Sequence, residues 1–492
     1  MINRNICGRG VVLAFVLSAS VSIHALAVTT HRLVNFAAAD YSRLDQYIRE
    51  SLGFAAGRAA VLRAPSMTAR DLLAEGGERE DDGGPFTGRF HNHFHNPLRP
   101  WGEAGLHLFG HKSSSVRWMQ DPQQAPGGHW AWADARQFYL RALTHPEAGT
   151  RERAAADLFR TLGQVMHLVV DASVPEHTRD DPHPFGGVVA NVLKRRQAGS
   201  YEYWVSDSRQ AGLVASLLAN PIGFDPSILS IPPPAGETVA TVPIARLIDT
   251  DRYAYHGSSP PNPNVTLGGG IGLAEFANAN FFSEDTLHGR FPFPSLQGLT
   301  ASPQKAPKGS AVRAYLAKPP GQGLPTSVAL AECVTERSVG RWIVNASPPY
   351  PCVDEAVWQE TATHMLPRAV GYARGVLDYF FRGKLAMELI VPVTFNDDDN
   401  PRWPYTEGIL LGVRNNSSET MSGSFEVYRG GSSQSRRKAI SATGTHSGAP
   451  GELIVMLLEV LPPGAPREHV LVFRGRLGSE EDAVASYAFV VP

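Results

Sequence analysis

The hydrophobic pattern changes near Lys384, and this change constrains the fold more than any other feature of the sequence. From about residue 28 to residue 384 apolar residues recur at helical spacing, as in Ala131–Leu143, Arg153–Val170 and Val357–Phe381. After Lys384, short β-branched and aromatic runs alternate with turn residues. We therefore predict a mainly α protein, with a helical domain over 28–384 and a C-terminal all-β sandwich domain over 385–492.

Six apolar runs are the expected strands of the β-domain: Leu389–Phe395, Ile409–Val413, Ser424–Tyr428, Leu453–Val460, Val470–Phe473 and Ala485–Val491. The polar stretch Gly430–Gly451, which contains Arg436-Arg437-Lys438, is expected to be a loop. Within the helical domain, Pro and Gly crowd into Ala219–Gly270 and Pro292–Pro351. Such composition is typical of irregular chain, so we predict two long loops over the helical body.

The first 27 residues have the pattern of an export signal. Arg4 and Arg9 precede the apolar run Val11–Ile23, and Ala25-Leu26-Ala27 offers a small-residue cleavage site. The run is shorter than the ~20 residues that span a bilayer; a buried N-terminal helix is the alternative. We predict a periplasmic or secreted protein.

Export bears on the cysteines, because disulfides form in oxidising compartments. Cys7 would leave with the signal, so the mature chain keeps Cys333 and Cys352. We predict that these two form a disulfide, against the alternative of two free buried thiols.

The net charge of the chain bears on whether it binds nucleic acid. Lys and Arg number 45 against 47 Asp and Glu, which gives a net charge of −2. A chain so close to neutrality is not expected to bind nucleic acid stably through a basic surface.

The chemistry concentrates in Thr161–Asp181. On a helix, His167 and Asp171 are four residues apart and project from one face. Pro175 then ends the helix, and His177 follows in the turn. A lone helical histidine is usually a core residue, but imidazole nitrogen and carboxylate oxygen together suit zinc.

Two further segments carry ligand-type residues. Arg89–Pro97 has three histidines in five positions, and Glu78–Asp82 is an acidic run. Each alone is also compatible with solvated surface. Together with the helix motif they predict ligands that converge from separate parts of the chain.

At these residues the sequence resembles the bacterial zinc-dependent phospholipases C, which share a fold with the fungal single-strand nucleases. His167 to His177 reads H-x-x-x-D-x-S-x-P-x-H, as in the family signature, although Leu168 and Val170 depart from it. The other matches, in the family's order, are Thr30-His31, His93-Phe94-His95-Asn96-Pro97 and Ser200–Val205.

The resemblance implies a site with two to three zinc ions. One zinc would be held by Asp81, His93, His167 and Asp171. A second would be held by His31, the free N-terminal amine and the bridging Asp171, and a third by His177 and Glu202. The family has a histidine four residues before this glutamate; Ala198 stands there, and His183 is the candidate replacement. Glu80 and Asp82 are alternatives to Asp81.

The implied activity is hydrolysis of a phosphodiester, most simply a phospholipid at a membrane surface, with Asp81 as the catalytic base. A nuclease of the same fold is one alternative, for which Trp101, Trp118, Trp130 and Trp132 are candidate base-stacking residues. A zinc-bearing scaffold or adhesion protein is the other. In toxins of this family the C-terminal domain binds lipid with calcium, and Asn396–Asn400 could supply oxygen ligands to Ca²⁺.

Overall fold

The computed structural model describes most of the chain from Ala27 onward, in the ranges 27–63, 66–82, 89–107, 112–124, 128–181, 200–239, 241–253, 270–283, 299–305, 312–317, 329–333, 350–396, 405–442, 444–461 and 464–491, together with residues 287, 294 and 296. Almost all of the predicted signal peptide therefore lies outside the described residues, as do His183, Ala198 and residues 397–400. Within the described ranges, no helix combines the length and the apolar character needed to cross a membrane.

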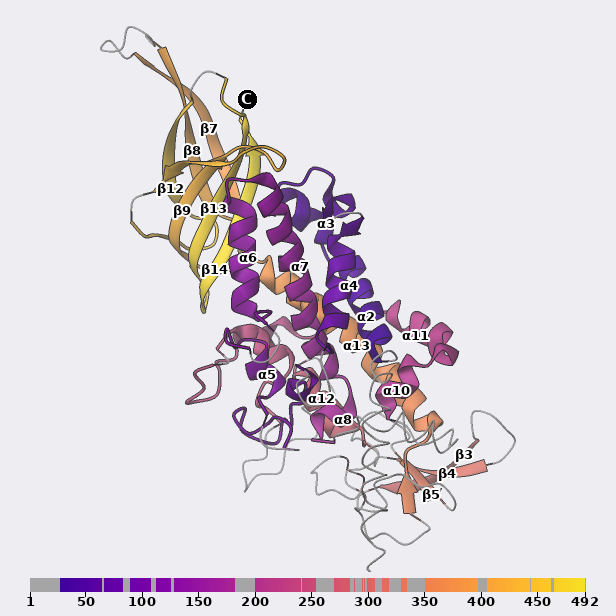
Figure 1. Cartoon of the computed structure of the whole chain (residues 1–492). Helices are drawn as coiled ribbons and strands as arrows, with labels where there is room; N and C mark the ends of the chain where they lie inside the picture. The colour runs from indigo at the N-terminus through magenta and orange to yellow at the C-terminus, as the bar shows by residue number, and fades with distance from the viewer. Residues whose placement is uncertain are drawn as a thin grey trace, which may run out of the picture.

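Long helices form the body of the N-terminal part (Figure 1): α2 (Ala27–Tyr41), α4 (Ala69–Arg79), α6 (Trp132–Thr144), α7 (Ala148–Asp171) and α13 (Glu355–Phe380). Helix α7 is central, because it packs against each of the other four. Its residues from Thr161 to Asp171 are all buried. A helix buried on every side holds its polar side chains in fixed positions, which matters for His167 and Asp171.

Shorter helices complete the helical part. They are α3 (Leu44–Gln46), η2 (Tyr47–Ser51), η3 (Gly57–Ala59), η4 (Arg89–Asn92), α5 (Ser115–Trp118), α8 (Pro175–Thr178), α10 (Tyr201–Ser206), η5 (Ser208–Gln210), α11 (Ala211–Leu218), η6 (Pro226–Ser230), η7 (Pro243–Leu247) and α12 (Leu273–Asn280). A two-stranded sheet pairs β1 (Val61–Arg63) with β2 (Met67–Thr68).

The prediction that Pro292–Pro351 is only a loop is wrong. This stretch contains most of an antiparallel sheet of order β3-β4-β5-β6, formed by Thr300–Lys305, Val312–Ala317, Ala329–Cys333 and Tyr350–Cys352. The Pro and Gly clusters that suggested irregular chain stand between these strands. Pro303 lies in β3, an edge strand, which is where a sheet tolerates proline.

The same sheet carries two of the cysteines. Strand β5 ends at Cys333 and pairs with β6, which ends at Cys352. Cys352 is disulfide-bonded. The pairing of Cys352 with Cys333 stays a prediction.

The C-terminal part is antiparallel β, as the sequence predicts. Its strands are β7 (Leu385–Asn396), β8 (Tyr405–Asn415), β9 (Met421–Arg429), β10 (Arg437–Ser441), β11 (His446–Gly448), β12 (Leu453–Leu461), β13 (Glu468–Leu477) and β14 (Glu480–Val490). One sheet has the order β12-β8-β7, the other β10-β9-β13-β14 with β11 beside β9. Buried side chains from both sheets, such as Leu411 and Phe473, form one core.

Strands β10 and β11 overturn the prediction of a loop over Gly430–Gly451. Arg436 is buried at the boundary with the helical part, where its Nη1 donates to the carbonyl oxygen of Leu143 over 2.5 Å. Arg151 of α7 donates to carbonyl oxygens of the same segment, including that of Gly431 at 3.0 Å. The polar residues of this segment therefore include some that contact the helical part and are not simply exposed to solvent.

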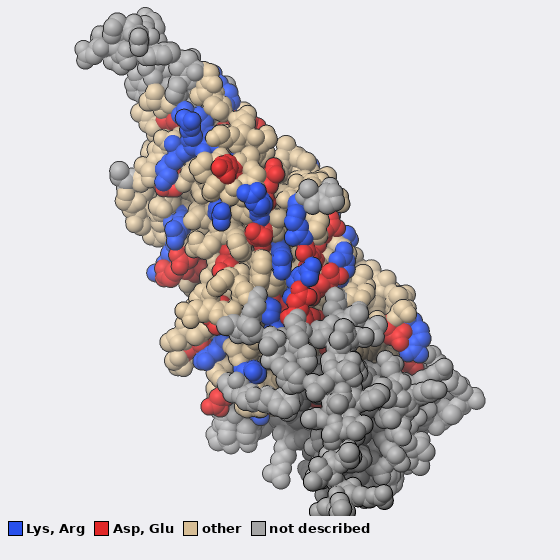
Figure 2. Space-filling view, in the orientation of Figure 1, with Lys and Arg blue, Asp and Glu red and all other residues tan. Residues whose placement is uncertain are grey.

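An ionic cluster joins the two parts of the molecule where α6 runs beside β14 (Figure 1). Glu480 of β14 is buried and accepts hydrogen bonds from Arg136 Nε at 2.8 Å and Arg382 Nη1 at 2.7 Å. Its Oε1 also accepts from Trp132 Nε1 at 2.8 Å. On the face seen in Figure 2, basic and acidic side chains are interspersed, in keeping with the near-zero net charge.

Candidate metal centre

Separate elements of the helical part each bring one or two ligand-type side chains to a single buried point. Helix α7 carries His167 and Asp171 in its last two turns, and α2 carries His31 in its first turns. The chain after α4 supplies Asp81, and the residue after η4 is His93. Side chains from motifs that lie far apart along the chain thus meet in the structure.

Asp171 lies at the centre of this cluster. Its Oδ1 is 3.2 Å from His31 Nε2, and its Oδ2 is 3.0 Å from His93 Nδ1 and 3.1 Å from His167 Nε2. The carboxylate and all three imidazoles are almost fully buried. The rings of His31 and His167 stack with their centroids 3.7 Å apart. One carboxylate therefore touches three imidazoles from three elements.

Asp81 is the acidic residue that the structure brings to the histidines. Its Oδ1 lies 3.6 Å from His93 Nδ1 and 3.7 Å from His167 Nε2. Asp82 is largely exposed and pairs with Arg79 at 3.1 Å. Glu80 is fully buried, but its carboxylate bonds to Arg89 and Trp118. Of the three alternatives left by the sequence, the geometry favours Asp81 as the ligand.

His177 and Glu202 lie beside the cluster. His177 Nε2 is 3.6 Å from Glu202 Oε2, and its Nδ1 is 3.7 Å from Asp171 Oδ2. Phe94 stacks on the His177 ring at 4.6 Å. His177 and Glu202 thus face each other beside Asp171, while His183 falls in a range that the structure does not describe.

Close helix packing sets the position of His167. Ideal Cβ atoms on Gly76 and Gly163 would lie 2.1 Å and 2.2 Å from backbone oxygens of the facing helix, so only glycine fits at this crossing of α4 and α7. Asn35 of α2 ties the crossing together by donating to Leu73 O at 2.9 Å and Gly163 O at 3.1 Å. The crossing is therefore tight on all three helices.

Electrostatics in the cluster follow from this burial. Burial alone would lower the pKa of His93 and of His167, but the Asp171 carboxylate raises them to about 10 and about 9. Burial alone would raise the pKa of Asp171, but the surrounding histidines hold it well below its usual value. The cluster therefore favours bound protons or another bound cation next to an ionised Asp171.

The donor set fits a metal ion. The atoms of His31, Asp81 and His167, and those of His93, His167 and Asp171, lie within 4.8 Å of one another in two overlapping groups. His31 Nδ1 is buried without a hydrogen-bond partner among the described residues, and the imidazole nitrogens at 3.0–3.2 Å from the two Asp171 oxygens are not in hydrogen-bond geometry. Buried polar atoms are normally satisfied. Mixed imidazole and carboxylate donors are those that zinc takes, whereas calcium takes oxygen alone.

Of the three histidines of Arg89–Pro97, His93 is the one that joins the cluster. His95 points elsewhere, with its Nε2 2.8 Å from Asp249 Oδ2, which also accepts from Trp101 Nε1 at 2.7 Å. His95 is tied to the site through its backbone, because its N–H donates to His177 O at 2.9 Å. Sequence reasoning missed Asp249, since it lies 154 residues from His95 and stands in no motif.

The tryptophans proposed for base stacking are mostly core residues. Trp101, Trp118 and Trp132 are buried, and each indole N–H donates to a carboxylate. Trp130 is half-buried, and the Arg160 guanidinium lies over its ring at 4.1 Å. The structure thus removes three of the four candidate stacking residues from any exposed surface.

Comparison with known proteins adds little. No protein-family model and no curated protein sequence matches the chain. Among solved structures, a crystal structure of Clostridium perfringens alpha-toxin isolated from avian strain SWCP aligns over 95% of this chain and 98% of its own, with 11% identity and a TM-score of 0.25. A TM-score this low does not establish a shared fold.

Proposed function

We propose that the protein is an exported, zinc-dependent phosphodiester hydrolase of the phospholipase C type. The observation that carries the proposal is the convergence of His31, His93 and His167 on the buried carboxylate of Asp171. Export rests on the N-terminal sequence pattern. The substrate class rests on the resemblance of the motifs to the zinc phospholipases C.

The candidate zinc ligands form two groups. The residues around Asp171 that would hold zinc are His31, Asp81, His93, His167 and Asp171. His177 and Glu202 would hold a further ion, with His183 as the proposed additional ligand. Two to three zinc ions are proposed in total. Calcium at Asn396–Asn400 remains a separate proposal, because residues 397–400 lie outside the described ranges.

Zinc bound here would supply Lewis acidity, which neutralises phosphodiester charge and lowers the pKa of water from ~15.7 toward ~7. The protein's own part is orientation and proton transfer. Asp81 keeps 14% of its side chain exposed, whereas Asp171 keeps 1%. Asp81 is therefore the carboxylate better placed to meet a water molecule and accept its proton, and Asp171 is the one better placed to fix the histidines.

The substrate would be a phospholipid, met by peripheral contact with a membrane, or another phosphodiester. A nuclease would use the same metal ligands, but Trp101, Trp118 and Trp132 are buried, so Trp130 alone of its four candidate base-stacking residues keeps exposed surface. A zinc-bearing scaffold without enzymatic activity would hydrolyse neither substrate, with or without zinc. Assays with phosphatidylcholine and single-stranded DNA, with and without chelator, separate the three.

The decisive variant is Asp171→Asn, which keeps the shape of the side chain and removes its charge. We expect wild-type protein to cleave phosphatidylcholine, to stop on chelation and to recover with added zinc. Asp171→Asn should lower the activity by more than the roughly 10–100-fold that follows when a residue that only orients a metal ligand is removed. Asp157→Asn, on the same helix but outside the cluster, is the control. Full activity of Asp171→Asn, or chelator-insensitive turnover, would contradict the proposal.

A further inference from the structure

We infer that Glu80 is a positioning residue that orients the His93 imidazole toward the metal, an inference that rests on the proposed zinc site. Glu80 and Asp81 are adjacent in sequence and follow directly on α4. Their carboxylates reach opposite nitrogens of the same ring. Asp81 Oδ1 is 3.6 Å from His93 Nδ1, and Glu80 Oε1 is 3.8 Å from His93 Nε2.

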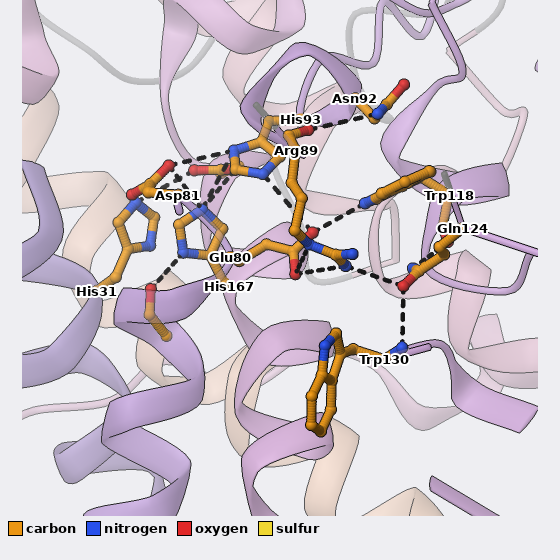
Figure 3. A network of polar contacts seen from close by, with 12 residues as sticks. His31, Glu80, Asp81, Arg89, Asn92, His93, Trp118, Gln124, Trp130 and His167 are labelled. Atoms are coloured by element: carbon orange, nitrogen blue, oxygen red, sulfur yellow. Dashed lines mark hydrogen bonds and ion pairs between the residues drawn. The ribbon is translucent and has the colours of Figure 1, made fainter. Parts of the chain in front are cut away.

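The position of the Glu80 carboxylate is fixed by three hydrogen bonds (Figure 3). Its Oε2 accepts from Arg89 Nε at 3.0 Å and Nη2 at 2.8 Å, and its Oε1 accepts from Trp118 Nε1 at 2.8 Å. The glutamate has no exposed surface, and Arg89 and Trp118 are also buried. A buried carboxylate held by a guanidinium and an indole N–H cannot rotate freely toward solvent.

Gln124 in turn holds the two donors, Arg89 and Trp118, in position. Arg89 Nη2 also donates to Gln124 Oε1 at 2.9 Å, and Gln124 Nε2 donates to Trp118 O at 2.7 Å. The Arg89 guanidinium lies over the Trp118 ring at 4.9 Å. The backbone N–H of Trp130 closes the network on Gln124 Oε1 at 3.1 Å (Figure 3). These bonds orient Glu80 and leave its Oε1 beside the histidine.

The consequence for His93 follows from the chemistry of imidazole. A neutral ring keeps its proton on one nitrogen and offers the lone pair of the other. Nδ1 faces Asp171 Oδ2 at 3.0 Å, on the side of the cluster, whereas Nε2 faces Glu80. A fixed carboxylate near Nε2 favours the proton there and leaves Nδ1 to bind metal. At 3.8 Å the contact is electrostatic and longer than a hydrogen bond.

This arrangement also explains why Glu80 itself is not counted among the ligands. Its two oxygens are already used by Arg89 and Trp118, so binding a metal would leave a buried guanidinium and indole without their acceptor. Neighbouring carboxylates thus take different roles, Asp81 toward the metal and Glu80 toward the ring that binds it.

The test compares Glu80→Gln with Asp82→Asn in the full chain. Both variants remove one carboxylate charge within three consecutive residues, but Asp82 is exposed and pairs with Arg79, not with a histidine. The readouts are the dissociation constant for zinc by competition with a chromophoric chelator, and the visible spectrum of the cobalt-substituted protein. We expect Glu80→Gln to raise the dissociation constant about 10–100-fold and to change the cobalt spectrum. Asp82→Asn should change neither.

Wild-type affinity and an unchanged cobalt spectrum in Glu80→Gln would overturn the inference while leaving the zinc site intact. Wild-type protein that binds no zinc would instead overturn the proposed function. If Glu80→Gln fails to fold by circular dichroism, Trp118→Phe is measured in its place, because it removes one donor to Glu80 and keeps the carboxylate. Weaker zinc binding in Trp118→Phe is expected, and unchanged binding would overturn the inference equally.

Discussion

His167 Nδ1 lies 2.7 Å from the carbonyl oxygen of Gly77, and because a carbonyl only accepts, the imidazole must donate there. This bond keeps a proton on Nδ1 and leaves Nε2 facing Asp171. A side chain on Gly77 would meet the Asn35 amide at 2.6 Å, so the carbonyl reaches His167 only because the helices approach closely. Helix packing therefore decides the tautomer of a proposed ligand.

The first prediction concerns this packing. Gly163→Ala would place a methyl group 2.2 Å from Leu73 O and force α4 and α7 apart. We expect the free energy of unfolding to fall by about 1–3 kcal/mol or more, and zinc affinity to fall with it. Denaturant titration and zinc titration measure the two effects. Gly149→Ala on the same helix, where the nearest atom is 3.9 Å away, is the control. Equal stability of the two variants would contradict the argument.

The second prediction concerns protons. In the metal-free protein the Asp171 carboxylate raises the pKa of His93 to about 10 and that of His167 to about 9, so we expect these imidazoles to hold bound protons at neutral pH. Zinc requires neutral imidazoles, so its binding should release protons at pH 7, and its affinity should increase as the pH rises toward 9. Calorimetric titrations in buffers of different ionisation enthalpy count these protons. A binding enthalpy that is the same in every buffer would rule out this release.

The third prediction concerns the junction between the helical and β parts. Arg136 and Arg382 lower the pKa of the buried Glu480 from 4.5 to about 2, although burial alone would raise it. A carboxyl with a depressed folded-state pKa stabilises the fold above its unfolded pKa, and this contribution is lost as the pH falls from about 5 to about 2. The contribution at pH 7 is about 3 kcal/mol.

Glu480→Gln should therefore lower the free energy of unfolding at pH 7 by about 3–5 kcal/mol, because it leaves buried guanidinium groups unpaired. It should also weaken the dependence of stability on pH below 5. The neighbouring Glu481, which is exposed, gives the control Glu481→Gln. Identical acid unfolding of wild type and Glu480→Gln would show that this ionic cluster does not stabilise the junction.

The spacing of apolar residues predicts much of the fold. The change at Lys384 separates helical from β structure, and each of the six expected β-domain strands overlaps an observed one. Strands β3 to β6 and β10 to β11 were not expected, because short strands among Pro, Gly and polar residues lack a run of alternating apolar positions. Their formation depends on partners: β10 follows Arg436, which is buried against α6.

The candidate site also has a part that the sequence predicts and a part that it does not. His167 and Asp171 could be placed together because four residues on a helix set their relative position. The network of Glu80, Arg89, Trp118 and Gln124 could not be predicted from the sequence. Its side chains meet through tertiary contacts, which no sequence spacing encodes. Sequence alone therefore suggested the ligands but not the groups that orient them.

Whether zinc binds at Asp171 can be measured by anomalous X-ray scattering, recorded from crystals of the protein on both sides of the zinc absorption edge. We expect an anomalous peak that appears above the edge, about 2.0–2.2 Å from an Asp171 oxygen and from imidazole nitrogens of His93 and His167. Crystals grown with zinc that show no peak among these three side chains, or zinc bound only elsewhere on the molecule, would contradict it.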